Sequence, residues 1–242
     1  MAEADESALK AKMRKVHWVP LESNPEMLTE FARRVGLPEG WEFVDVYGVD
    51  EGLLAMVPRP VVAVTLLFQC TEASSQHKKA QMERIKASGQ TVNPSIKYLR
   101  QYVGNACGTI ASIHSMANNA DVLGVMPDTP LGRFLQQAEG KTPEESGALL
   151  AEATDLHRAS ESSAAGGQTA APEATADVDH HFICFVEKGG DVYELDGAKQ
   201  FPINHGSSGG DLLVAATQAI KANFMDVDPE SISFNMMALV RA

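Results

Sequence analysis

The chain has 242 residues, 44% hydrophobic and 21% charged, enough to bury the core of one large domain or two small ones. Its formal net charge of −12 argues against a nucleic-acid partner, and no apolar run is long enough to cross a bilayer. Three cysteines without a CxxC pair indicate free thiols rather than a zinc finger or disulfide framework, and no secretory signal opens the chain, so we expect a cytoplasmic protein.

The chain begins with a polar stretch and then changes character. Residues 1–15 carry many charges and no periodic pattern, so we expect a flexible tail before a single domain over residues 16–242. Asn24 and Pro25 are typical of a helix N-cap and first helical position, and Gly36 is typical of a helix end. Apolar residues at helical spacing between them predict one amphipathic helix.

Strands and helices are mixed along the middle of the chain. Alternation over 42–47 and the apolar run 61–68 predict two strands, the second buried on both faces. The charged residues 72–88 predict a solvated helix or a mobile loop. Further helices are predicted to begin at Cys107, Thr129 and Thr142.

Residues 158–177 interrupt this pattern. They hold almost no large apolar side chain and are rich in Ala, Ser and Gly, so they cannot offset the entropy of ordering. We expect a mobile loop, which at this length inside a compact domain is typically a linker or a functional lid.

A β-hairpin is predicted next. Residues 188–191 are Lys-Gly-Gly-Asp, and strand-like sequence flanks them at 181–187 and 192–196. The chain is predicted to end with a helix over 212–225 and a strand over 232–240. This mixture predicts an α/β or α+β fold with an antiparallel part.

Cys107 is the strongest candidate for chemistry. It stands at the predicted start of a helix, where free N–H groups and the helix dipole favour the nucleophilic thiolate. Gln101, six residues earlier, carries an amide that can stabilise an oxyanion when a thiolate attacks a carbonyl. The alternative is an inert buried cysteine, and this stretch by itself leaves the two interpretations near even.

A catalytic cysteine needs a histidine as its base. His114 shares the predicted helix with Cys107, but seven residues at about 1.5 Å each place it roughly 10 Å away along the axis. With a two-residue hairpin turn, His181 lies diagonal to Asp196 on one face of the sheet, and His180 points to the other face. A turn longer by one residue would reverse that choice.

Together these candidates are Gln101, Cys107, His181 and Asp196. Their order along the chain, glutamine, cysteine, histidine and acid, matches that of papain-like enzymes. In addition, Gln-x-x-x-Asn-Ala-Cys-Gly at 101–108 resembles the signature of the small ubiquitin carboxyl-terminal hydrolases. The likeness covers about residues 17–242, through Trp-Val-Pro-Leu-Glu, Tyr-Glu-Leu-Asp-Gly and Phe-Pro-Ile-Asn-His-Gly. The family implies a papain-like α/β fold with a central antiparallel sheet flanked by helices, a knotted backbone, and a long crossover loop over the active site, here about 158–177.

The resemblance also implies roles for individual residues. Cys107 would be the nucleophile, His181 the general base and acid, Asp196 the group that orients the histidine, and Gln101 part of the oxyanion hole. The family's ubiquitin-contact segments correspond to Pro20, Leu21, Glu22, Pro25, Gly167, Gln168, Thr169, Phe234 and Asn235. No metal or organic cofactor is expected.

We therefore expect a thiol-dependent deubiquitinase that hydrolyses amide or ester bonds after the C-terminal glycine of ubiquitin and prefers small or unfolded adducts. A ubiquitin-like modifier is a second candidate substrate, and we expect a monomer that binds neither nucleic acid nor membrane. Two rival hypotheses are a ubiquitin-binding pseudoenzyme without hydrolysis and a general endopeptidase. The complete set of four site residues argues against the first rival, and the long loop argues against the second.

Overall fold

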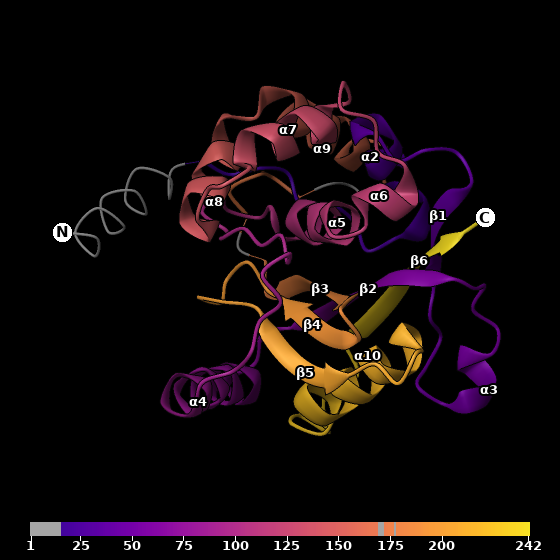
Figure 1. Cartoon of the computed structure of the whole chain (residues 1–242), viewed down its shortest axis with the longest axis vertical. Helices are drawn as coiled ribbons and strands as arrows, with labels where there is room; N and C mark the ends of the chain where they lie inside the picture. The colour runs from indigo at the N-terminus through magenta and orange to yellow at the C-terminus, as the bar shows by residue number, and fades with distance from the viewer. Residues whose placement is uncertain (1–15, 169–171, 177) are drawn as a thin grey trace.

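One sheet separates two layers of helices (Figure 1). The computed structural model describes residues 16–168, 172–176 and 178–242, so the tail predicted at 1–15 lies outside the described residues. Six strands hydrogen-bond in the order β1-β6-β2-β3-β4-β5, and each neighbouring pair is antiparallel. They are β1 (Trp41–Asp45), β2 (Val61–Gln69), β3 (His180–Lys188), β4 (Asp191–Leu195), β5 (Ile203–Ser207) and β6 (Phe234–Arg241). The predicted central antiparallel sheet is confirmed, whereas the knot stays a prediction.

The helices lie on both faces of this sheet. They are α2 (Pro25–Val35), α3 (Glu51–Leu54), α4 (Glu72–Ser88), α5 (Cys107–Ala117), α6 (Ala120–Leu123), α7 (Pro130–Ala138), α8 (Pro143–Glu152), α9 (Thr154–Ala164) and α10 (Leu212–Ile220), followed by a short π-helix, η1 (Lys221–Met225). In Figure 1, α2 and α5 to α9 lie above the sheet and α10 lies below it. None of the helices in the described part of the chain is long and apolar enough to cross a membrane.

The strand β2 is mostly apolar, and both of its faces are covered. Ala63 belongs to the hydrophobic cluster that includes α5, whereas Val64 and Leu66 belong to the cluster that includes α10. The predicted strand at 61–68, buried on both faces, is therefore confirmed. This double burial holds the middle of the sheet in place against α5, which carries the candidate nucleophile.

The predicted helix boundaries follow from local capping. Asn24 accepts hydrogen bonds from the backbone N–H groups of the first turn of α2, and Gly36 ends this helix with a φ of 126°. Thr142 and Glu145 form a capping box at the start of α8. Residues 72–88 form the helix α4, which was one of the two predicted alternatives.

The predicted loop at 158–177 is wrong in its first part, because α9 continues to Ala164. Its small side chains serve close packing: Ala159, Ser160 and Ala164 are buried, and α9 packs against α2. The hydroxyl of Ser160 lies 2.8 Å from that of Thr109 on α5. A lack of large apolar residues therefore marks a close helix contact here rather than disorder.

The hairpin of β3 and β4 has the predicted register. Lys188 pairs with Asp191 around the two glycines, and Cys184 pairs with Leu195 at the far end. The predicted final helix is split, since α10 stops at Ile220 and the chain continues as η1. The predicted final strand is present as β6, which begins at Phe234.

Candidate active site

The candidate nucleophile begins the central helix of the upper layer. Cys107 is the first residue of α5, all of whose residues are buried. The backbone N–H groups of Gly108 and Phe182 donate to its sulfur, and His181 hydrogen-bonds the same atom. The strand β3 therefore brings both a histidine and a backbone donor to the start of α5. This placement confirms the predicted helix start and favours the thiolate.

His181 and Asp196 meet as the hairpin register predicts. The Nε2 atom of His181 lies 2.6 Å from Oδ1 of Asp196, and the carboxylate is almost fully buried. Because Nε2 contacts the acid, Nδ1 is the ring nitrogen left for Cys107. The ring of His180 contacts the exposed Asp179 instead, at 2.7 Å. The structure thus brings His181, and not its neighbour, to the acid.

The electrostatics of these three groups favour an ion pair. Burial by itself raises the pKa of Cys107, but the hydrogen bond and charge of His181 and two backbone N–H groups outweigh it, and the pKa is lowered. Burial likewise disfavours the imidazolium, yet the charge and hydrogen bond of Asp196, together with Cys107, raise the pKa of His181 to about 10. These shifts favour the thiolate form of Cys107 beside the His181 imidazolium.

Asp196 stays ionised despite its burial. Burial raises its pKa, but the charge and hydrogen bond of His181, and then the charge of Lys78, lower it well below the usual range. The backbone N–H of Ala198 donates to Oδ1 at 2.9 Å. The Tyr98 hydroxyl lies 2.5 Å from the backbone carbonyl oxygen of Asp196, so the acid is held through its main chain as well.

Gln101 is anchored to the same loop as the acid. Its backbone N–H donates to the carbonyl oxygen of Gly197 at 2.8 Å. A Cβ added at Gly197 would lie 3.1 Å from Cβ of Gln101, so this close approach favours glycine. The side-chain Nε2 donates to the carbonyl oxygen of Val103 at 3.1 Å. Because an amide nitrogen carries two hydrogens, one N–H remains for a substrate oxygen.

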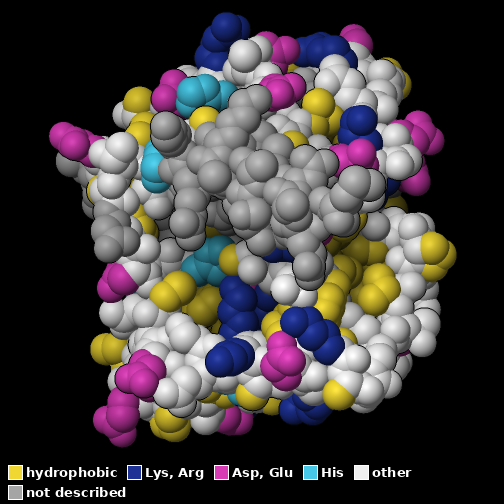
Figure 2. All heavy atoms as spheres, turned by 90° about the vertical axis from the view of Figure 1, so that its left-hand side faces the viewer, with side chains coloured by type: hydrophobic (Ala, Val, Ile, Leu, Met, Phe, Trp, Pro, Cys, Tyr) yellow, Lys and Arg dark blue, Asp and Glu magenta, His cyan; other side chains and the backbone are white. Residues whose placement is uncertain are grey.

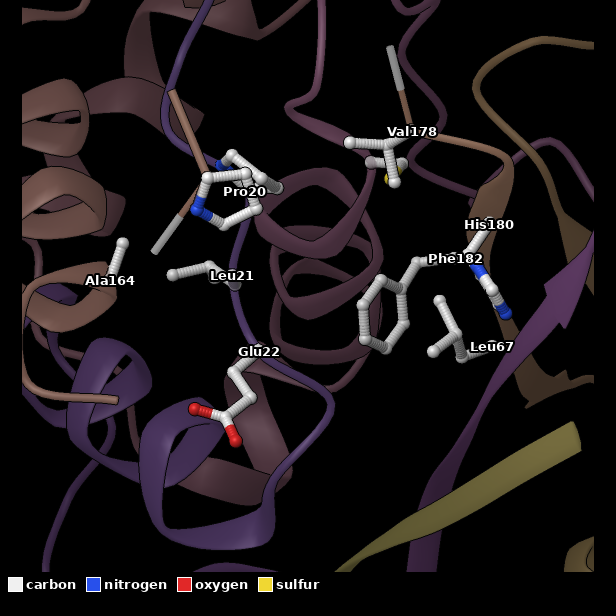
Figure 3. A pocket seen from close by; sticks show the side chains of 10 residues that line it. Pro20, Leu21, Glu22, Leu67, Ala164, Val178, His180 and Phe182 are labelled. Carbon is white, nitrogen blue, oxygen red and sulfur yellow. The ribbon is translucent and has the colours of Figure 1, made fainter. Parts of the chain in front are cut away.

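A pocket lies beside the sulfur of Cys107. It has a volume of about 220 Å³ and is lined by Pro20, Leu21, Glu22, Leu67, Cys107, Ala164, Pro172, Val178, His180 and Phe182. Figure 3 shows Pro20, Leu21 and Glu22 on one side and Phe182, His180 and Leu67 on the other. The backbone N–H of Gln168 donates to the Glu22 carboxylate at 2.8 Å, so the chain after α9 is joined to the N-terminal segment here.

The remaining predicted contact residues that the structure describes are not among those that line this pocket. Ser23 donates to the side-chain oxygen of Asn235 at 2.7 Å, which joins the start of β6 to the same N-terminal segment. Pro25 begins α2, Phe234 begins β6, and Gly167 precedes Gln168. Thr169 lies outside the described residues. Substrate contact stays a prediction for all nine residues.

Two functional candidates escaped sequence reasoning. Asn105 has a φ of 58°, a backbone conformation that asparagine tolerates better than most residues, and its side-chain nitrogen donates to the carbonyl oxygens of Ala174 and Ala176, each at 2.9 Å. It therefore ties the segment after α9 to the turn before Cys107. The other candidate is Lys78 on α4, 118 residues before the acid it contacts.

The excluded histidine has a structural role. His114 is fully buried on α5, its Nε2 accepts a hydrogen bond from the backbone N–H of Leu99 at 3.1 Å, and its ring stacks on Tyr98. Burial lowers the pKa of His114 to about 4, so it is neutral at physiological pH. The prediction that His114 packs rather than acts as the base agrees with this arrangement.

Comparisons with known proteins agree on one family. The family model described as ubiquitin carboxyl-terminal hydrolase, family 1, matches residues 18–226. A probable ubiquitin carboxyl-terminal hydrolase from Dictyostelium discoideum is 41% identical over 93% of this chain and 88% of its own. The ubiquitin carboxyl-terminal hydrolase isozyme L1 from Homo sapiens is 37% identical over 92% of this chain and 98% of its own. The Trichinella spiralis UCH37 catalytic domain, solved with ubiquitin vinyl methyl ester bound, matches 97% of this chain and 99% of its own with a TM-score of 0.70 and 21% identity.

Proposed function

This chain belongs to family 1 of the ubiquitin carboxyl-terminal hydrolases, and from that premise we propose that it is a cysteine deubiquitinase that cleaves after the C-terminal glycine of ubiquitin. The observation that carries the proposal is the buried set of Cys107, His181 and Asp196, joined by hydrogen bonds at the start of α5. Such a set has the three parts that acyl transfer by a thiol requires: a nucleophile, a base and an orienting group.

The proposed reaction has two steps. The Cys107 thiolate attacks the carbonyl carbon of the terminal glycine, and the His181 imidazolium gives its proton to the leaving nitrogen or oxygen, which leaves a thioester. Neutral His181 then takes a proton from water as the water oxygen attacks the thioester carbon. The C–S bond breaks to return the Cys107 thiolate, and the ubiquitin C-terminus leaves as a carboxylate after its proton passes to solvent. Asp196 holds the ring in place and balances its charge, while the Gln101 amide and the first turn of α5 stabilise the oxyanion.

The surroundings of Cys107 favour a narrow, basic, glycine-ended tail. Glycine has no side chain to clash with Phe182 and Leu21 beside the sulfur, and the Glu22 carboxylate lies where a basic residue can approach. The net charge of −12 adds long-range attraction for such a tail. The segment held by Asn105 crosses beside the site, which supports the preference for small or unfolded adducts. A ubiquitin-like modifier with a similar tail is a second substrate, and we propose a cytoplasmic monomer.

The test is turnover of ubiquitin carrying a fluorogenic C-terminal amide. Wild type should release the fluorophore, and Cys107→Ala should lose turnover by at least a thousandfold while still binding ubiquitin. A vinyl methyl ester of ubiquitin should label wild type at Cys107 with 1:1 stoichiometry. Binding without labelling or turnover would favour the pseudoenzyme, and cleavage of casein would favour the general endopeptidase.

A further inference from the structure

The helix α4 lies apart from the main layers, at the lower left of Figure 1. Of its seventeen residues only Gln81 and Met82 are buried. A cavity of about 170 Å³ lies between α4 and the pair of His181 and Asp196. Close apolar packing therefore cannot be what sets the position of α4 against the catalytic residues.

Two reciprocal polar contacts join α4 to the loop after β4. The ammonium group of Lys78 lies 2.9 Å from Oδ2 of Asp196, and the ammonium group of Lys199 lies 2.7 Å from Oε1 of Gln81. Lys78 and Gln81 are three residues apart on one face of the helix, and Asp196 and Lys199 are three residues apart in the loop. Each segment therefore contributes one lysine that contacts an oxygen of the other segment, and the two contacts have the same three-residue spacing on both sides.

Residues of β4 and β5 hold the loop after β4 in place. Lys199 forms a buried ion pair with Glu194 on β4, and Nε2 of His205 on β5 lies 2.9 Å from the other oxygen of the same carboxylate. Burial opposes the charge of Glu194, but Lys199 and His205 outweigh it and lower its pKa to about 2. A buried charge network with satisfied partners is rigid, so α4 is anchored to a fixed part of the sheet.

The contact bears directly on the catalytic acid. One oxygen of Asp196 binds His181, and Lys78 binds the other, so the plane of the carboxylate is set from both sides. The Lys78 side chain is about one-third exposed, whereas that of Asp196 is 2% exposed. A charge-assisted bond to a buried carboxylate is among the stronger polar contacts in proteins.

We propose that α4 is a positioning element for catalysis, in which Lys78 holds Asp196, and through it the His181 ring, while Gln81 ties the helix to Lys199. This inference rests on the proposed function, because it concerns the same reaction. Lys78 touches no reacting atom and is absent from the lining of the pocket beside Cys107. It is therefore a positioning residue, and its loss should lower kcat rather than raise KM.

Lys78 also contributes a positive charge to the site. The titratable and charged groups around it are Cys70 at the end of β2, His77 on α4, Cys107 on α5, His181 on β3, and Asp196 and Lys199 after β4. Removing the Lys78 cation makes protonation of the Cys107 thiolate easier. An Asp196 carboxylate that is held less firmly also stabilises the His181 imidazolium less, and this imidazolium in turn stabilises the thiolate. Both effects raise the pKa of Cys107, so the acid limb of the kcat/KM profile should move to higher pH.

The experiment compares Lys78→Met and Lys78→Arg with Lys79→Met, which removes an exposed lysine from the adjacent position. With fluorogenic ubiquitin, Lys78→Met should lower kcat on the order of tenfold to a hundredfold, with KM within about twofold of wild type. Lys78→Arg should restore most of kcat, and Lys79→Met should behave as wild type. A folded Lys78→Met protein with wild-type kcat and pH profile would overturn the proposal.

Two further measurements separate positioning from folding and from the proposed function. Gln81→Met removes the contact between Gln81 and Lys199 and should also lower kcat. If Lys78→Met does not fold, the kcat of Gln81→Met tests the role of α4 in its place, and a wild-type kcat would overturn the proposal. The rate of alkylation of Cys107 by iodoacetamide, followed against pH in a Cys70→Ser background, reports the thiolate without any turnover. The pH at which alkylation begins should be higher for Lys78→Met than for wild type and unchanged for Lys79→Met. If Lys78→Met and wild type have the same pH profile, the inference is overturned. If wild type does not turn over ubiquitin but Lys78→Met still shows the expected shift, only the proposed reaction is refuted.

Discussion

Replacing Asp196 with Asn keeps the shape of the side chain and removes its charge, which tests how the buried acid supports the nucleophile. His181 gains about 5 kcal/mol of preference for the imidazolium as its pKa rises from 6.5 to about 10. Asp196 supplies the largest favourable part of that rise, through its charge and a 2.6 Å hydrogen bond. If Asp196 accounts for half of the preference, its loss amounts to roughly 2.5 kcal/mol, or on the order of a hundredfold.

We therefore expect Asp196→Asn to lower kcat/KM about a hundredfold at pH 7 and to narrow the pH profile. The alkaline limb of the profile moves to lower pH because the His181 pKa drops toward its ordinary value. The acid limb moves to higher pH because the Cys107 thiolate loses its cationic neighbour. The assay is turnover of fluorogenic ubiquitin between pH 5 and 10.

Asp179→Asn is the matched control, since that acid contacts the adjacent His180 at 2.7 Å in an exposed pair. It should leave both the rate and the profile close to wild type. If Asp196→Asn kept more than a third of wild-type kcat/KM with unshifted limbs, the ion-pair account of the site would be refuted.

Three other predictions test the neighbouring structure. His181→Ala should abolish turnover of fluorogenic ubiquitin while His180→Ala keeps most of it, because only His181 contacts the acid; the reverse result would contradict the hairpin register. Asn105→Ala should lose two hydrogen bonds that hold the crossing segment, each worth about 1 kcal/mol, so larger ubiquitin adducts should be cleaved faster relative to small ones. An unchanged ratio between a folded adduct and a short peptide adduct would contradict this role. Glu194 has a pKa lowered from 4.5 to about 2, so its contribution to stability is present above pH 4.5 and is lost as the pH falls toward 2. Glu194→Gln should therefore unfold at lower urea concentration than wild type at pH 7, with the difference shrinking below pH 4, and a constant difference across this range would show that the charge is not responsible.

The parts of the site that sequence could predict are those set by local rules. The two-glycine turn specifies the register of β3 and β4, and that register alone separates His181 from His180. Cys107 at the start of a helix follows from the change of pattern after Gln101, because helix boundaries depend on nearby residues. The capping residues of α2 and α8 were predictable for the same reason.

The small residues of α9 show where local composition misleads. A run of Ala and Ser predicts disorder when the chain is considered alone, since these residues bury little apolar area. The same residues allow α9 to approach α2 and α5 closely, and the hydroxyl contact between Ser160 and Thr109 spans 51 residues. Whether small side chains mean a loop or a close contact depends on the surface they meet, which is a tertiary property.

The amino-acid sequence by itself predicted which cysteine, histidine and acid would form the candidate site, because each is tied to a turn or helix start that its neighbours encode. Only the tertiary structure decided what holds the acid in place. Lys78 and Asp196 are 118 residues apart, and no local pattern relates a lysine on a charged helix to a carboxylate beyond a distant strand. Their contact exists because the fold places α4 beside the loop after β4, where the Lys78 ammonium group gives the buried Asp196 carboxylate a second charged partner.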